Sequence, residues 1–140
     1  MTRQRVSITQ TFPFSVSKLF DHLGEHENLA ALFFPARVSR LRDGNSERNG
    51  VGSVRRLRIP PGPPFEETVT VFVPNQRIEY KITRGSPLKN HYGTMLFSGD
   101  DKSATLDYTI EFEGRLPGIG FIVKHLLTNS ISRALRKLKL

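Results

Sequence analysis

The chain has 140 residues, enough for one domain with a substantial core. Hydrophobic residues make up 37% of it, too many for an intrinsically disordered chain, and no apolar run approaches the roughly 20 residues that span a bilayer. The absence of cysteine excludes a disulfide framework, a zinc ribbon and a thiol nucleophile. The segment from Met1 to Arg5 is basic and leads into alternating residues instead of an apolar signal segment, so we expect a cytoplasmic protein.

The formal net charge of +8 is unevenly distributed along the chain. Seven arginines lie between Arg37 and Arg58 against two acids, and no acid follows Glu113. Such a field attracts polyanions, or only keeps a small domain soluble. Docking on RNA, on a ribosomal surface or on an anionic membrane is therefore one alternative function. Nucleic acid is not the partner we favour, because the regularly placed exposed aromatic residues of single-strand platforms are missing.

The first predicted elements are a strand and two short helices. Apolar and polar residues alternate over 6–12, which is the pattern of a half-buried strand. Ser15 is expected to cap a helix over 16–23 that Gly24 ends, and residues 25–32 predict a second short helix.

Six further strands are predicted between residue 36 and residue 112, because alternating segments are separated by turn signals. They are expected over 36–42, 53–59, 65–73, 78–82, 91–97 and 106–112. The proline-rich segment 60–64 is expected to be a rigid loop, although such clusters can also dock on a partner's aromatic groove. One face of the strand 65–73 is predicted to carry Phe65, Glu67, Val69, Val71 and Val73.

After Pro117 and Gly118 the apolar residues recur three and four apart, which predicts an amphipathic helix of about twenty residues. Its predicted apolar stripe is Ile119, Ile122, Val123, Leu126, Leu127, Ile131, Ala134, Leu135 and Leu138. Only the concave face of the sheet offers an apolar surface of that length. The predicted fold class is therefore α+β: a curved antiparallel sheet of about seven strands wrapped around a long C-terminal helix, as a single domain over 1–140.

Several short motifs, in this order, resemble the Bet v 1-like or START-like (SRPBCC) superfamily, in its polyketide cyclase/dehydrase and lipid-transport branch. The motifs are FSVSKLF at 14–20, GVGSVRR at 50–56, FEETV at 65–69, IEY at 78–80 and LDYTIEF at 106–112. Tyr108 stands where the family usually has a tryptophan. The resemblance implies a helix-grip fold, β-α-α-β6-α, with an internal apolar cavity between the sheet and the C-terminal helix.

For function, the resemblance implies binding or transport of a small, largely apolar metabolite such as a lipid, polyketide or quinone. Some members of the superfamily catalyse ring closure or dehydration, so a cyclase or dehydratase activity is an alternative. The fold alone does not choose between them, because function depends on the residues of the cavity.

Arg55 and Glu67 are the most informative pair of charges. Each shares a strand face with apolar neighbours on adjacent strands of a predicted hairpin, so both are expected to point inward. Ions placed there are costly unless they are paired or contact a ligand. The pair is thus either a buried salt bridge or an anchor for a carboxylate, enol or carbonyl group of a ligand.

The residues expected to contact the ligand are Arg55, Leu57, Glu67, Val69, Tyr80, Tyr92, Tyr108, Ile110, Ile122 and His125. His125 lies beside the apolar stripe of the last helix and can serve as a general base there, or only border the core. If the protein is an enzyme, Arg55, Glu67 and His125 are the candidate catalytic residues.

No metal or cofactor is expected. His22 and His26 have a spacing that can hold zinc, but Gly24 lies between them and no third ligand is identifiable, so we expect two solvent-facing histidines. Nothing resembles a phosphate loop or a dinucleotide fingerprint. His91 begins a predicted strand, and the sequence gives it no further role.

Overall fold

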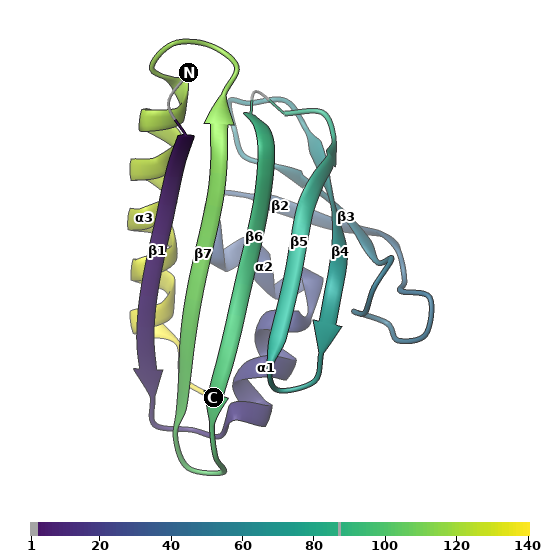
Figure 1. Cartoon of the computed structure of the whole chain (residues 1–140), viewed down its shortest axis with the longest axis vertical. Coiled ribbons are helices and arrows are strands. Elements are labelled where there is room, and N and C mark those ends of the chain that lie inside the picture. The colour runs from purple at the N-terminus through teal and green to yellow at the C-terminus, as the bar shows by residue number, and fades with distance from the viewer. Residues whose placement is uncertain (1–2, 87) are drawn as a thin grey trace.

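The computed structural model describes residues 3–86 and 88–140. Within these residues, seven strands form one antiparallel sheet in the order β1-β7-β6-β5-β4-β3-β2 (Figure 1). The strands are β1 (Arg3–Phe12), β2 (Arg37–Arg42), β3 (Val54–Arg58), β4 (Phe65–Val73), β5 (Arg77–Arg84), β6 (Leu88–Gly99) and β7 (Ala104–Gly114). The helices are α1 (Val16–Gly24), the 3-10 turn η1 (His26–Asn28), α2 (Leu29–Leu32) and α3 (Ile119–Lys137). This order confirms the predicted helix-grip fold.

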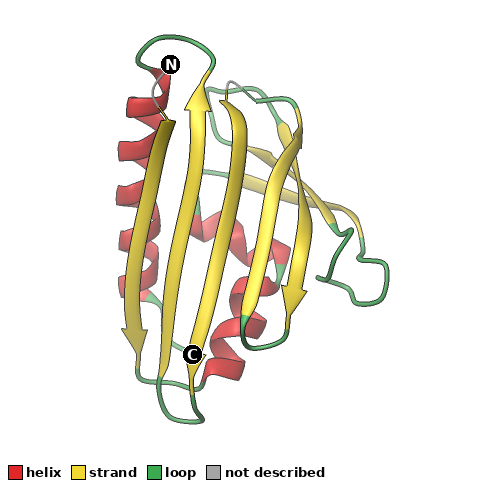
Figure 2. Cartoon of the chain, viewed as in Figure 1, coloured by secondary structure: helices red, strands yellow, loops and turns green. Residues whose placement is uncertain are grey.

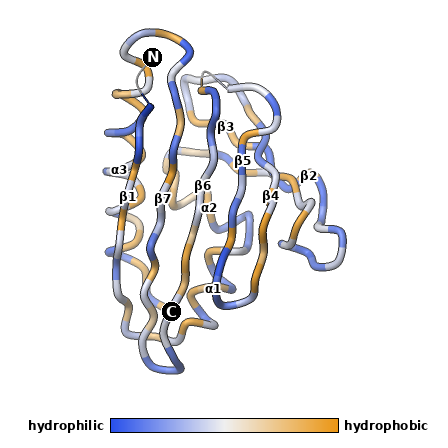
Figure 3. Tube along the Cα trace, in the orientation of Figure 1, coloured by the Kyte–Doolittle hydropathy of each residue, from blue (hydrophilic) through white to orange (hydrophobic). Residues whose placement is uncertain are grey.

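The sheet is strongly curved, with β2 and β3 turning back behind the other strands, and all helices lie on its concave side (Figure 2). Hydropathy alternates along the strands, as Figure 3 shows, because successive side chains point to opposite faces. On β7 the inward set is fully buried and comprises Leu106, Tyr108, Ile110 and Phe112. None of the helices in the described part of the chain is long and apolar enough to cross a membrane.

The first helix begins where the sequence predicts. The Ser15 hydroxyl accepts a hydrogen bond from the Lys18 backbone N–H at 3.1 Å, which caps α1. The Phe20 ring of this helix packs against the rings of Phe72 and Phe97, with centroids 5.2 and 5.0 Å away. The helix is thereby fixed across one end of the sheet.

One prediction of strand phase is wrong. The pairing of β4 with β5 shifts between Val69 and Val71, so the alternation on β4 reverses after Thr70. As a result Val73 is exposed, whereas Phe72 packs against the core. A β-bulge of this kind adds a residue to one strand, and a strict period of two cannot anticipate it.

Helix α3 lies along one side of the concave face, where it packs on β1, β7 and α2. Its C-terminal half is anchored: Leu135 is 1% exposed, and the Leu135 carbonyl accepts a hydrogen bond from the Gln10 side chain at 3.0 Å. Its N-terminal half packs more loosely: Ile119, Val123 and Leu127 are only half-buried against the core, and Leu126 is 63% exposed. The helix therefore leaves room between itself and the strands on the far side of the sheet.

Candidate ligand-binding site

A cavity of about 400 Å³ occupies the space between α3 and strands β3 to β7. It is lined mainly by apolar side chains: Phe33, Leu57, Ile59, Phe65, Ile82, Leu88, Ile110, Ile119, Val123 and Leu127. Phe34, which is 75% exposed, Ile122 and Leu126 also line it, together with the loop Pro60–Pro63. Because these last residues are exposed, we place the mouth of the cavity between them. Size and lining are those of a small-molecule site.

The cavity has one polar wall, made by Glu67 on β4, Tyr80 on β5 and His91 on β6. Arg55 on β3 lies behind Glu67, and its Nε atom donates a hydrogen bond to Glu67 Oε1 at 2.9 Å. The Arg55 guanidinium also lies 4.6 Å from the centre of the Tyr80 ring, a cation–π contact. Arg55 and Glu67 are both buried, on the inward faces that the sequence predicts.

One donor of Arg55 is left over. Arg55 Nη2 lies 2.8 Å from Glu67 Oε1, but its N–H bonds do not point at that oxygen or at any other acceptor among residues 3–86 and 88–140. Glu67 in turn directs its other oxygen, Oε2, away from Arg55 and toward His91. The ion pair thus leaves hydrogen-bonding capacity on Arg55 Nη2 and on Glu67 Oε2.

His91 is held by the backbone of the neighbouring strand. The Ile82 N–H donates to His91 Nδ1 at 3.1 Å, so the proton of the neutral ring is on Nε2. That atom lies 3.8 Å from Glu67 Oε2. Burial lowers the pKa of His91, and the Glu67 carboxylate only partly opposes this. At neutral pH the wall therefore presents one N–H donor beside one carboxylate acceptor.

Tyr80 completes the polar wall, and its position is fixed by contacts with Tyr108 and Gly93. Its hydroxyl group forms a hydrogen bond with the hydroxyl of Tyr108, and burial raises the pKa of both phenols. Gly93 pairs with Tyr80 across β5 and β6, and a Cβ atom at Gly93 would collide with the Tyr80 ring. The absence of a side chain at Gly93 is what lets the Tyr80 ring pack against β6.

The structure brings together five of the ten residues expected to contact a ligand: Leu57, Glu67, Tyr80, Ile110 and Ile122 line the cavity. Three others are buried but lie outside its lining, namely Arg55, Val69 and Tyr108. Two expected positions are wrong. Tyr92 is on the outer face, where its hydroxyl donates to Glu111 Oε2 at 2.5 Å, and His125 is exposed, with its ring 4.4 Å from that of Phe121.

Sequence reasoning missed His91, although the signal was present. Met95 and Phe97 are buried on β6, and a period of two counted back from them places His91 inward and Tyr92 outward. The inward histidine is therefore the one on β6, and the histidine of α3 points to solvent.

The expectation of two solvent-facing histidines near the first helix is also wrong. His26 is fully buried, with Nε2 3.1 Å from the Ser53 hydroxyl, which itself donates to the Gly50 carbonyl at 2.7 Å. Burial, and then the charge of Arg55, lowers the pKa of His26 to about 3. Within residues 3–86 and 88–140, no group of three or more His, Cys, Asp or Glu is placed to hold a metal ion.

The fold and cavity define a helix-grip ligand-binding protein. A family model described as "Polyketide cyclase / dehydrase and lipid transport" matches residues 3–140, and the chain belongs to this family. The predicted superfamily is thereby confirmed. No curated protein matches the sequence significantly.

Solved structures share the fold at low sequence identity. A START superfamily protein from Mycobacterium smegmatis is 20% identical, with a TM-score of 0.74 over 94% of this chain and 93% of that one. The Zhui aromatase/cyclase from Streptomyces sp. R1128 is 19% identical, with a TM-score of 0.69 over 96% and 88%. Norcoclaurine synthase from Thalictrum flavum, solved with dopamine and hydroxybenzaldehyde, is 14% identical, with a TM-score of 0.63 over 99% and 90%.

Proposed function

We propose that the protein binds and carries a small, largely apolar metabolite in the cavity between the sheet and α3. The observation that carries this proposal is the cavity itself, about 400 Å³ in volume, apolar on most sides and polar on one. Apolar walls favour a hydrocarbon or aromatic body, because its transfer from water is favourable in proportion to the area buried.

The polar wall specifies one hydrogen-bonding group on that ligand. His91 Nε2–H can donate and Glu67 Oε2 can accept, and the two atoms lie 3.8 Å apart. A hydroxyl group can accept from the first and donate to the second. A ligand with one hydroxyl, or one enol, on an apolar body therefore fits this cavity better than a pure hydrocarbon.

A titration with the neutral apolar fluorophore N-phenyl-1-naphthylamine tests the proposal. The wild-type protein should bind it saturably at one site while fully folded. Val123→Trp, which fills the cavity from α3, should abolish binding. Phe121→Trp is the matched control, because Phe121 is exposed on the same helix and does not line the cavity. Equal binding by both variants would place the probe elsewhere and refute the proposal.

We propose a cyclase or dehydratase activity as the second candidate, supported by the carboxylate of Glu67 at the cavity wall. Ring closure and dehydration of polyketides both begin with removal of a proton from a carbon next to a carbonyl group. A positioned carboxylate can accept that proton. His91 Nε2–H is placed to donate a hydrogen bond to the enolate oxygen.

Glu67→Gln distinguishes the two candidates. In a carrier, this variant should keep binding of the neutral fluorophore and have no reaction to lose. In an enzyme, it should keep binding but lose turnover of a β-hydroxy ketone by about a hundredfold or more, the usual contribution of a general base. Loss of product formation is measured by mass spectrometry of the small-molecule fraction.

A further inference from the structure

The segment 37–58 contains seven arginines, and only some of them have partners in the folded chain. Four of its seven arginines are held by partners: Arg55 by Glu67, Arg40 and Arg48 by Glu25, and Arg42 by Asn45. The other three are Arg37, Arg56 and Arg58, all exposed. None of them makes an ion pair with a carboxylate in the part of the chain that the structure describes.

These three arginines lie together on the outer face of β2 and β3. Arg37 is directly opposite Arg58 in the pairing of the two strands, and Ser39 is directly opposite Arg56. Like charges placed opposite each other on one face destabilise a sheet. The arrangement therefore has a cost that an anion bound between the guanidinium groups would relieve.

The neighbouring strand does not neutralise this face. Glu66 on β4 is opposite Arg56, but it is also opposite Arg84 on β5, so one acid is flanked by two arginines. Arg37 and Arg58 lie two register pairs further along, and Arg58 has no acid opposite it in the pairing of the strands. The positive charge is thus concentrated at the end of β3 that leads into the proline loop.

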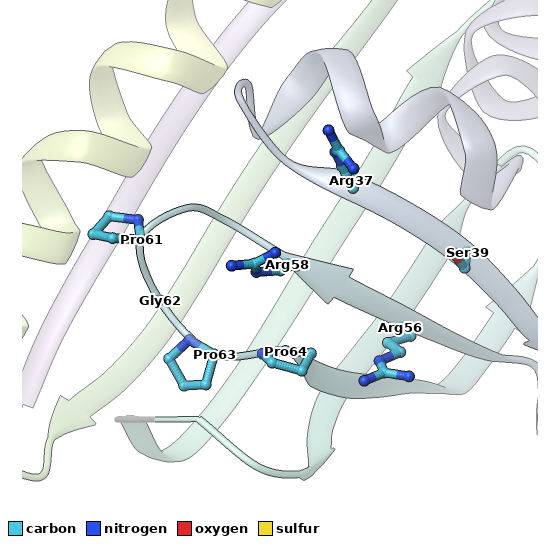
Figure 4. Close-up of a pocket in the computed structure, with 8 residues that line it drawn as sticks. All are labelled: Arg37, Ser39, Arg56, Arg58, Pro61, Gly62, Pro63 and Pro64. Atoms are coloured by element: carbon cyan, nitrogen blue, oxygen red, sulfur yellow. The ribbon is translucent and has the colours of Figure 1, made fainter.

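The same residues form a pocket beside the mouth of the ligand cavity. Arg37, Ser39, Arg56 and Arg58 line a space of about 560 Å³ together with the loop Pro61–Pro64. Figure 4 shows these residues on β2, on β3 and in the loop. We call this space the arginine pocket. Pro61, Gly62 and Pro63 line the ligand cavity as well, so a single loop separates the two spaces.

We propose that the arginine pocket binds the phosphate-bearing end of an amphiphilic ligand whose apolar part occupies the cavity. This inference rests on the proposed binding function and names its ligand class. A guanidinium group offers a planar fork of donors that matches phosphate oxygens, and it stays charged at any physiological pH. A phosphate monoester carries close to two negative charges at pH 7 and three acceptor oxygens, which suits a pocket lined by three arginines better than a single carboxylate does.

Displacement of N-phenyl-1-naphthylamine by decyl phosphate and by decanol, below their micelle concentrations, tests the proposal. The wild-type protein should bind decyl phosphate about tenfold or more tightly than decanol. The variant Arg37→Gln/Arg56→Gln/Arg58→Gln should bind both equally, while its affinity for the fluorophore stays unchanged. The charge-matched control is Lys18→Gln/Lys102→Gln/Lys139→Gln, at exposed positions outside both lined spaces, and it should keep the preference for phosphate.

Two results would overturn the inference while the proposed function stands: equal wild-type affinities for decyl phosphate and decanol, or a preference that survives in the arginine variant. If the wild-type protein does not bind the fluorophore at all, the proposed function fails and the inference fails with it.

Vesicles identify the source of the phosphate. Sedimentation with phosphatidic acid vesicles but not with phosphatidylcholine vesicles, lost in the arginine variant, would support the inference with a membrane lipid as the ligand. Binding of decyl phosphate without sedimentation would support it with a soluble phosphate ester.

Discussion

Arg55 Nε lies 2.9 Å from Glu67 Oε1, and both side chains are buried, Glu67 in the wall of the ligand cavity and Arg55 outside its lining. Removal of either charge leaves the other buried without its partner, which costs far more than the pair contributes. Arg55→Met should therefore lower the free energy of unfolding by about 3 to 5 kcal/mol. The double variant Arg55→Met/Glu67→Gln should be destabilised less than the sum of the two single variants. Chemical denaturation of all four proteins measures this cycle.

The same variants separate a structural pair from one that serves binding. If the pair only joins β3 to β4, the folded double variant should bind N-phenyl-1-naphthylamine and decanol as the wild type does. If Glu67 also positions a ligand hydroxyl, decanol should bind more weakly and the fluorophore, which has no hydroxyl group, should not. If the losses of stability in the two single variants add up to the loss in the double variant, Arg55 and Glu67 do not interact in solution.

Gly93 should be intolerant of even a methyl group. A Cβ atom there meets the Tyr80 ring, so Gly93→Ala should destabilise the protein by about 1 to 3 kcal/mol through overpacking. The loss of stability caused by Gly93→Ala should be smaller in a chain that already carries Tyr80→Leu, because the smaller side chain leaves room for the methyl group. Thermal melts of the single and double variants check this, and a Gly93→Ala protein as stable as the wild type would contradict the packing.

Two leucines of α3 should behave in opposite ways. Leu135 is 1% exposed, so Leu135→Ala should cost about 2 to 5 kcal/mol of stability. Leu126 is 63% exposed and lines the cavity, so Leu126→Ala should cost little stability but weaken binding of the apolar fluorophore. Denaturation and titration of both variants measure the contrast. A large stability loss in Leu126→Ala would mean that the Leu126 side chain is packed into the core in solution.

Stability should fall on mild acidification because of His26. The folded protein holds the pKa of His26 at about 3, whereas the unfolded chain binds the proton near pH 6.5. The unfolded state therefore binds more protons between these values, so stability is fully present above pH 6.5 and is lost as the pH falls. Between pH 8 and pH 5 the free energy of unfolding should fall by about 2 kcal/mol for this reason.

His26→Gln tests that pH dependence, because glutamine can still bond to Ser53 but does not titrate. The variant should lose less stability than the wild type between pH 8 and pH 5, measured by urea unfolding at each pH. His91, whose pKa is also lowered, should account for part of the loss that remains. An unchanged pH dependence would show that His26 is not buried in solution.

Much of the fold could be predicted from the sequence because its signals are local and regular. Ser15 caps α1, the alternation of β7 has no bulge, and the apolar stripe after Gly118 has a helical period. The inward orientation of Arg55 and Glu67 followed from the same period of two. These features depend on neighbours in the chain, and tertiary contacts only reinforce them.

The parts of the site that could not be predicted depend on non-local geometry. The β-bulge near Thr70 reverses the inward–outward alternation of β4, and no residue type at this point of the sequence predicts a bulge. His125 lies next to apolar residues in helical projection, but α3 is turned so that the face bearing His125 meets solvent. Three arginines in a basic segment have no ion-pair partner among the described residues, and only the fold shows which three.

The proposed ligand enters the space between α3 and strands β3 to β7. A titration with decanol followed by amide ¹H–¹⁵N chemical shifts locates the ligand residue by residue. We predict that the largest changes occur at lining residues such as Leu57, Tyr80 and Val123, and that Val6 and Leu135, buried outside the cavity, change little. Changes confined to the outer face of the sheet, or none at saturating decanol, would contradict the account.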